Sequence, residues 1–462
     1  MRRDVFTYIM FLLMAIALSS CITESEKINN PVEFKPQDGV EYLETSLSFD
    51  SAISNANFIY SNTENMTKKT RRISKVDLLT SADLNAVAAT RSNGNEGVKN
   101  TPLAYIVNYA DNQGYAILAA DEQLPPVIAI GDSGTFSTEK FLQFVGGEEY
   151  TRTGSDITPA QEIQYAMVNN SLTLPVLPVY PNPATPTGHD TVLILKCMPL
   201  VPTKWGQGSP YNYYSPLDDN GNKCVAGCVP IAGAQVLTSL CYHHNFKPSV
   251  TIDSEYPVDW FMLNKTIYRD TLRYDYNEIT PGSMNIASLV RAVGKYLNAD
   301  YSATATSAST YNLTNLYSML GLSSIEYGGT DSISTNDLFD MIVARNYPVN
   351  ARASRIKDDN ETVGHSFILD GWLRLEYNRM GMSQYPGSGD GLSFGVMDNI
   401  QHQFDLVHVN FGWNGTCDGY YLPGAFDASS DDYHDYAEEN DNAVVRPYVY
   451  DIDVKYITYR LN

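Results

Sequence analysis

The middle of the chain is rich in residues that interrupt regular structure. Between positions 175 and 188 the sequence contains Pro175, Pro178, Pro181, Pro183, Pro186 and Gly188. Proline fixes φ and lacks a backbone N–H, so this stretch supports neither a continuous helix nor a central strand. We therefore predict an inter-domain linker over residues 151–194. It divides the 462-residue chain, which is long enough for two or three domains, into two folded parts.

The first residues have the pattern of an export signal. Arg2 and Arg3 precede an apolar run over residues 5–18, which is too short for a comfortable membrane span. The run ends in Leu18-Ser19-Ser20-Cys21, which resembles a bacterial lipobox, whose cysteine is acylated and becomes the new N-terminus. We predict a lipoprotein signal over 1–20, lipidation of Cys21 and a flexible tether over 21–74 that has room for one helix. The expected location is exported and lipid-anchored to a bacterial membrane, at the outer membrane or cell surface; an ordinary signal peptide with an incidental cysteine is the alternative.

Charge and cysteine content narrow the possible functions. The net charge of −22 repels nucleic-acid backbones, so we expect no nucleic-acid partner. An odd number of cysteines remains if Cys21 is lipidated, namely Cys197, Cys224, Cys228, Cys241 and Cys417. In an oxidising compartment this leaves at least one thiol or an intermolecular bond, and nucleophilic catalysis is one reason to keep a thiol. The chain has no HExxH motif and no paired Cys–His ligand spacing, so we predict no metal and no other cofactor.

The N-terminal folded part, residues 75–150, has the pattern of a small α+β unit. Residues 103–109 and 114–120 have β-strand patterns, and the turn-forming residues 110–113 between them predict a hairpin. A further strand over 125–130 and a helix over 138–145 are expected to follow.

The C-terminal part, residues 195–462, combines helices and strands. Residues 228–243 are apolar on nearly all sides, which predicts a buried helix, and helical spacing predicts two more over 286–297 and 338–344. Strands are expected over 366–372, 406–410, 419–422 and 444–459. The predicted α+β order is a helix that carries Cys228, further helices, and then an antiparallel sheet that carries His365 and Asn410.

Cys228 and His365 are the candidate nucleophile and base. Pro230 belongs in the first turn of a helix, which places the thiol of Cys228 at the helix N-terminus, where the positive end of the dipole favours the thiolate. His365 follows Gly364 at the head of an apolar strand, where a neutral imidazole can take the thiol proton. His408 is a rival base, because strand alternation places it on the same face as Asn410. Taken singly, a structural cysteine and a satisfied core histidine are the simpler explanations.

Two polar side chains complete the predicted site. Asn410 can accept a hydrogen bond from the far nitrogen of the base and fix its tautomer. The side-chain amide of Gln207, together with the backbone N–H of Cys228, can donate to a tetrahedral oxyanion. A turn asparagine and a loop glutamine flanked by glycines are the ordinary alternatives.

Four segments together resemble the streptopain family of bacterial cysteine proteases: KWGQGSPYN, GCVPIAGAQVL, GHSFILDGW and HVNFGWNGTCDGYYL. The chain order Gln, Cys, His, Asn is the papain-like layout. The resemblance implies a papain-like fold and an endopeptidase that cleaves proteins or peptides through a thioester acyl-enzyme. The supporting residues would be Trp205, Phe411, Gly412 and Trp413. Residues 75–150 resemble that family's inhibitory prodomain, which implies a self-inhibited zymogen that is processed within 151–194.

Several questions stay open at this point. A disulfide between Cys224 and Cys417 would join the loop before Cys228 to the loop after Asn410; reduced thiols are the alternative. Residues 373–405 look longer than in the family and are expected to form a hairpin near the cleft.

The competing functions are a catalytically silent surface-binding lipoprotein on the same fold and a Cys/His acyltransferase of the transglutaminase type. That acyltransferase class usually orients its histidine with aspartate, whereas Asn410 stands here.

Overall fold

The computed structural model describes residues 34–42, 46–63, 71–83, 100–120, 126–136, 138, 192–264, 279–329, 331–356, 362–385, 394–422, 426–427, 449–450 and 452–461. Residues 1–37 and 38–462 form separate units, and every helix and strand named below belongs to the second. The predicted signal, Cys21 and nearly all of the predicted linker lie outside the described residues. Within the described ranges, no helix combines the length and apolarity that crossing a bilayer would require.

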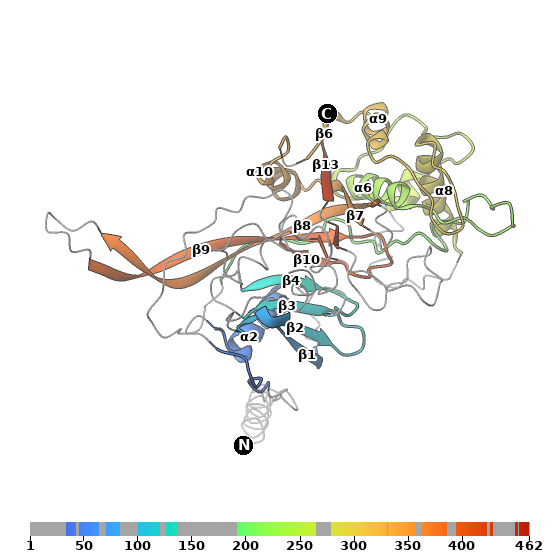
Figure 1. The fold of residues 1–462 in the computed structure, drawn as a ribbon. Coiled ribbons are helices and arrows are strands. Elements are labelled where there is room, and N and C mark those ends of the chain that lie inside the picture. Colours follow the sequence, from blue (N-terminus) through green and yellow to red (C-terminus); the bar gives the residue numbers. More distant parts are fainter. Residues whose placement is uncertain are drawn as a thin grey trace, which may run out of the picture. The chain divides into compact units, whose positions relative to one another are not determined.

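A large antiparallel sheet organises the described part of residues 38–462 (Figure 1). Its strands, in spatial order, are β1 (Ile73–Thr80), β2 (Pro102–Tyr109), β3 (Tyr115–Ala119), β4 (Val127–Gly131), β10 (Gly419–Tyr421), β9 (Phe394–Asn410), β8 (Thr362–Tyr385), β7 (Val349–Ile356), β13 (Ile452–Arg460) and β6 (Ser323–Gly328). Strand β5 (Val192–Cys197) also pairs with β8, and a separate pair joins β11 (Phe426–Asp427) to β12 (Val449–Tyr450). Together with the helices below, this sheet confirms the predicted α+β class.

The N-terminal strands β2, β3 and β4 are buried along their whole length. The turn between β2 and β3 places Asp111 and Asn112 in the left-handed region, with φ of 58° and 55°, which suits short polar turn residues. The predicted hairpin over 103–120 and the predicted strand over 125–130 are both confirmed. The helix predicted over 138–145 lies almost wholly outside the described residues.

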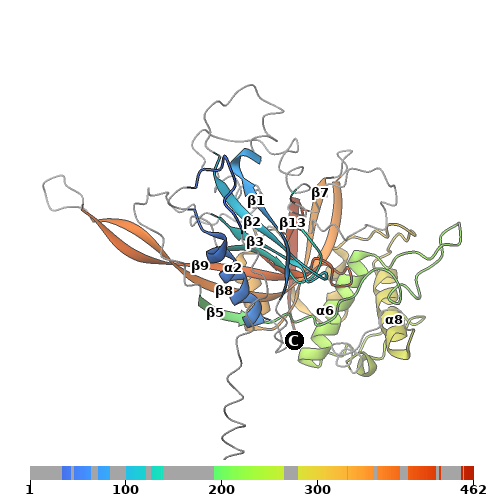
Figure 2. The same ribbon diagram turned by 90° about the horizontal axis from the view of Figure 1, so that it is seen from below.

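Helix α2 (Phe49–Thr63) is the one helix expected within the stretch predicted as a tether, and it packs against β3 and β4 (Figure 2). Its Tyr60 hydroxyl donates to the backbone oxygen of Tyr115 at 3.1 Å. Just before the helix, the backbone oxygen of Leu47 accepts from the Tyr105 hydroxyl at 2.8 Å. Leu47 and helix α2 therefore pack against the N-terminal strands, while the domain limit at 74/75 itself stays a prediction.

The C-terminal part places its helices beside one end of the sheet. Helix α6 (Cys228–His244) is buried from Val229 to Cys241 and packs against α8 (Pro281–Tyr296) and against β8 and β7 (Figures 1 and 2). A capping box of Thr280 and Ser283 begins α8. The other helices are α9 (Asn312–Met319), α10 (Thr335–Phe339) and the π-helical turn η1 (Asp340–Ala344). All three predicted helices of this part are confirmed, with η1 forming most of the one over 338–344.

Strands β8 and β9 form a long hairpin that pairs from Ile368 opposite Asn410 to Tyr385 opposite Phe394. The predicted hairpin over 373–405 is therefore confirmed. Its position relative to a cleft stays a prediction.

The N-terminal and C-terminal strands join where β4 pairs with β10. Gly131 lies opposite Gly419, and the backbone N–H of Asp132 donates to the backbone oxygen of Asp418 at 2.6 Å. A Cβ added at Gly419 would lie 2.1 Å from the backbone oxygen of Ile130, which is closer than any real contact. A side chain at position 419 is thus incompatible with this pairing.

We expect Gly419→Ala to separate β4 from β10 in the full chain. Because local opening sets amide exchange, hydrogen exchange in residues 127–131 should become about tenfold faster or more, which corresponds to a loss of about 1.4 kcal/mol. Gly329→Ala is the matched control, because the nearest atom to its added Cβ is the flexible end of Lys455 at 3.2 Å. Equal exchange rates in both variants would contradict the pairing.

Candidate active site

Cys228 is the first residue of α6 and is partly exposed, whereas its neighbours from Cys224 to Cys241 are buried. Gly227 precedes it with φ 90°, and a Cβ there would lie 2.8 Å from the Thr306 side chain. The loop before Cys228 is also held by the Thr306 hydroxyl, which donates to the backbone oxygen of Val225 at 2.7 Å. The fold therefore presents one thiol at the accessible N-terminal end of an otherwise buried helix.

The loop that carries Gln207 is tied to this segment and to the turn after β9. The backbone oxygen of Gln207 accepts from the N–H of Ala226, two residues before Cys228, at 2.8 Å. The backbone oxygen of the buried Trp205 accepts a hydrogen bond from the N–H of Asn414 at 3.1 Å. These bonds place Gln207 next to the loop before Cys228, as a shared oxyanion site would need.

His365 lies near the start of β8 and is 5% exposed. Its Nε2 is 2.8 Å from the backbone oxygen of Phe411, and its ring stacks on Trp413 with 4.4 Å between ring centroids. A carbonyl can only accept a hydrogen bond, so Nε2 carries the proton and the lone pair of the neutral ring is on Nδ1. The site thus fixes the histidine tautomer with a backbone group.

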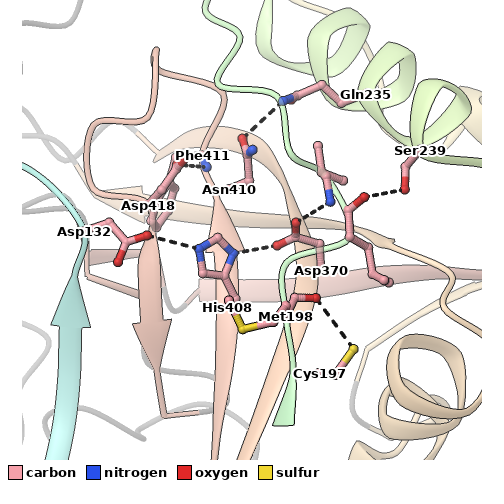
Figure 3. Close-up of polar contacts among 12 residues, drawn as sticks. Asp132, Cys197, Met198, Gln235, Ser239, Asp370, His408, Asn410, Phe411 and Asp418 are labelled. Atoms are coloured by element: carbon pink, nitrogen blue, oxygen red, sulfur yellow. Dashed lines mark hydrogen bonds and ion pairs between the residues drawn. The ribbon is translucent and has the colours of Figure 1, made fainter. Parts of the chain in front are cut away.

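Asn410 does not occupy the place expected for it, because the partner of Nε2 is the carbonyl of Phe411. The Asn410 amide donates to the backbone oxygen of Thr203 at 2.8 Å, and its Oδ1 accepts from the N–H of Gly412 at 3.0 Å. Gln235 of α6 also donates to this Oδ1 at 3.4 Å (Figure 3). Asn410 therefore holds the 411–412 peptide group, whose carbonyl holds His365.

The same peptide lies against the first turn of α6. A Cβ added at Gly412 would be 3.2 Å from the side chain of Ile231, which follows Cys228 by about one helical turn. Gly412 has φ 73°, a conformation that glycine adopts readily. The close approach at Gly412 thus brings the backbone partner of His365 to the end of the helix that carries Cys228.

His408, the rival base, has a different environment. Its Nδ1 lies 2.6 Å from Asp370 and its Nε2 lies 3.7 Å from Asp132, so both ring nitrogens face carboxylates (Figure 3). Burial lowers the pKa of His408, but Asp370 and Asp132 outweigh it and raise the pKa to about 10. Because carboxylates face both of its ring nitrogens, His408 is poorly placed to take the thiol proton, which argues against the alternative assignment.

Three carboxyl groups near the site were missed by the sequence reasoning: Asp132, Asp370 and Asp418. Asp370 also accepts from the N–H of Val201 at 2.8 Å, and Asp418 accepts from the N–H of Phe411 at 2.9 Å (Figure 3). Asp370 and Asp418 lie inside two of the family-like segments, GHSFILDGW and HVNFGWNGTCDGYYL, but each precedes a glycine and looks like an ordinary turn residue. Burial raises the pKa of Asp418 to about 7.

The structure also bears on the possible disulfide between Cys224 and Cys417. The structure joins none of the described cysteines in a disulfide, so the suggested bond between Cys224 and Cys417 is absent. Within the described ranges, no group of three or more His, Cys, Asp or Glu side chains is arranged to hold a metal ion.

Two family models match the chain. Residues 205–421 match the peptidase C10 family, and residues 45–145 match the Spi protease inhibitor. The chain carries an Spi inhibitor domain followed in sequence by a peptidase C10 domain. The resemblance to the streptopain family is therefore confirmed.

Individual relatives are distant. Streptopain of Streptococcus pyogenes serotype M1 is 23% identical over 255 residues, which cover 49% of this chain and 54% of that protein. The thiol protease/hemagglutinin PrtT of Porphyromonas gingivalis is 23% identical over 187 residues, or 40% of this chain and 20% of that protein. The chain thus spans about half the length of the streptopains it matches.

Two solved structures from Prevotella intermedia are also similar. Active wild-type interpain A is 20% identical with a TM-score of 0.37, covering 57% of this chain and 94% of that one. A prointerpain A fragment is 18% identical with a TM-score of 0.42, covering 79% of this chain and 98% of that one.

We expect His408→Ala to act on stability. The substitution leaves Asp132 and Asp370 without their buried cation, which should cost about 3–5 kcal/mol of unfolding free energy. Because the pKa of His408 is raised, this stabilisation is present below the ordinary histidine pKa and is lost as pH rises through about 10. The difference from wild type in urea unfolding should therefore shrink above that pH.

His244→Ala provides the control, because His244 is only partly buried and its Nε2 lies 3.0 Å from a single backbone oxygen, that of Asn346. Its effect should stay below about 0.5 kcal/mol. A His408→Ala protein as stable as this control at neutral pH would show that the two carboxylates do not depend on the imidazolium.

Proposed function

We propose that the protein is an exported cysteine endopeptidase made as a self-inhibited precursor, with Cys228 as nucleophile and His365 as base. The observation that carries the proposal is the hydrogen bond between Nε2 of His365 and the carbonyl of Phe411. This bond leaves the lone pair of the ring on Nδ1, and the carbonyl belongs to a loop that lies on the first turn of the Cys228 helix.

The residues support a two-step acyl transfer. Nδ1 of His365 takes the proton of the Cys228 thiol, and the thiolate attacks the substrate carbonyl carbon. The oxyanion that forms accepts hydrogen bonds from the backbone N–H of Cys228 and the side-chain amide of Gln207. The imidazolium then protonates the leaving amine, and water hydrolyses the thioester. Stacking of Trp413 on His365 keeps bulk water away from one ring face.

The Spi-like domain supplies the proposed inhibitor. Its strand β4 extends the catalytic sheet by pairing with β10, and Asp132 at the end of β4 forms an ion pair with His408. The Ser133 hydroxyl adds a bond to the backbone oxygen of Gly415 at 2.7 Å. Because these contacts reach the turn that holds His365, a docked prodomain is well placed to restrain the site until cleavage within 151–194.

The competing functions are less well supported. A Cys/His acyltransferase would use the same pair to pass the acyl group to an amine, but a protease-inhibitor domain in the same chain favours peptide hydrolysis. A catalytically silent binding protein would tolerate loss of a site residue, and Gln207, Cys228, His365 and Asn410 are all present.

Export and anchoring are part of the proposal. Arg2 and Arg3, the apolar run over 5–18 and the lipobox-like Leu18-Ser19-Ser20-Cys21 support acylation of Cys21 and attachment to a bacterial membrane. The polar sequence that follows supports a tether that lets the enzyme reach protein or peptide substrates.

We expect Cys228→Ala to accumulate as the full-length exported precursor, because self-cleavage needs the thiolate. A trace of active wild-type enzyme should convert it, since the linker stays cleavable in trans, and N-terminal sequencing of the product should give a start within residues 151–194. Cys197→Ala is the control, because Cys197 is likewise partly exposed and its thiol bonds to the backbone oxygens of Met198 and Ile342. If purified Cys228→Ala matures alone at the wild-type rate, self-processing is wrong.

We also expect metabolic labelling with palmitate to tag the wild type and Cys197→Ala but not Cys21→Ala. Acylation needs the Cys21 thiol, so the unlabelled variant should appear in the soluble fraction rather than with membranes. Label of equal intensity on the Cys21→Ala protein would remove the lipoprotein proposal and leave the peptidase proposal standing.

A further inference from the structure

We propose that Asp418 is a positioning residue for His365, and that its buried carboxylate holds the Phe411 backbone so that the Phe411 carbonyl stays on Nε2. This inference rests on the proposed peptidase function, because it places Asp418 behind the Cys228–His365 pair. It assigns a function to a residue that the sequence presents as an ordinary turn aspartate.

The geometry fixes Phe411 on both sides. Oδ1 of Asp418 accepts from the N–H of Phe411 at 2.9 Å, and Oδ1 of Asn410 accepts from the N–H of Gly412 at 3.0 Å. The first bond holds the 410–411 peptide group and the second holds the 411–412 group. The carbonyl on His365 cannot rotate away without breaking one of these buried bonds.

Stability alone does not explain an acid at position 418. Asp418 is 2% exposed, and burial of a carboxylate is costly, as the upward shift of its pKa to about 7 shows. An asparagine could accept the same backbone hydrogen bond without that cost. What the carboxylate adds is negative charge beside the 410–411 peptide group, next to the peptide group whose carbonyl accepts from His365. Positive charge develops on His365 when it takes the thiol proton.

Charged groups from three other segments face Asp418. Lys204 and His408 lower its pKa, whereas Asp132, which follows β4 of the prodomain, raises it. The N–H of Asp132 also donates to the backbone oxygen of Asp418 at 2.6 Å. Loss of the prodomain removes the charge of Asp132 and part of the burial, so the pKa of Asp418 should fall. The carboxylate is then ionised in the processed enzyme at neutral pH.

The test compares processed wild type with Asp418→Asn and Asp418→Ala, each converted by a trace of active enzyme. The measured quantity is kcat/KM on a peptide substrate against pH. The rate of Cys228 alkylation by iodoacetamide, with the labelled cysteine identified by peptide mass spectrometry, and thermal unfolding are recorded in parallel. Asp405→Asn, on the same strand as Asn410 and in an ion pair with Arg374, is the matched control.

We expect the alkaline limb of the kcat/KM profile to move to lower pH, because loss of a nearby negative charge disfavours the His365 imidazolium. Asp418→Asn keeps an acceptor but loses the charge, so the midpoint should fall by about half a pH unit, with kcat/KM about threefold lower above the midpoint. Asp418→Ala loses both the acceptor and the charge, and should show a fall of about one unit and a tenfold loss. The control variant should keep the wild-type midpoint even if it unfolds at a lower temperature.

An Asp418→Asn midpoint equal to that of wild type would overturn the assignment, whatever happens to thermal stability. Failure of the proposed function looks different, because wild type itself would then cleave no peptide and alkylate Cys228 no faster than the other cysteines. The asparagine variant is nearly isosteric, so the decision does not depend on whether Asp418→Ala folds.

Discussion

The turn from Asn410 to Gly419 is the constraint on which the rest of the site depends. Its side chains and backbone groups bond to four neighbours: the Thr203 segment, helix α6 through Gln235, His365 on β8, and Ser133 after β4. Each bond is buried or partly buried, so water cannot easily replace it. A shift of this turn would therefore move the base, the nucleophile helix and the prodomain contact together.

The contact between prodomain and catalytic domain follows from the same turn. Pairing of β4 with β10 supplies backbone hydrogen bonds, which are not selective for one partner. The ion pair of Asp132 with His408, which also pairs with Asp370, adds a charged contact at one defined place. When Asp132 leaves, His408 keeps Asp370, so the catalytic domain retains a paired buried cation. This arrangement lets the prodomain detach without leaving a buried charge uncompensated.

Local signals in the sequence were enough to predict most elements but not how the site residues meet. Pro230 and the apolar stretch after it identified the Cys228 helix, and Gly364 followed by apolar residues identified the strand of His365. The role of Asn410 depended on strand register, which the sequence does not show: Ile368 lies opposite Asn410, so His365, three residues earlier, lies beyond the end of this pairing and stacks on Trp413. The shift between Leu369 and Gly371 was equally hidden in the sequence, and the residue at the shift, Asp370, is the one that bonds to His408.

A backbone carbonyl as the partner of the base has an electrostatic consequence. It accepts one hydrogen bond and fixes the tautomer, but it carries only a partial charge and stabilises an imidazolium less than a carboxylate would. The peptide group at 411–412 compensates in part, because its N–H donates to Asn410 and this polarises the carbonyl. Asp418 adds negative charge at the neighbouring 410–411 peptide group, where it acts on His365 through space without itself competing for the proton of His365. Orientation and charge, which a single residue could provide, are here divided between Asn410 and Asp418.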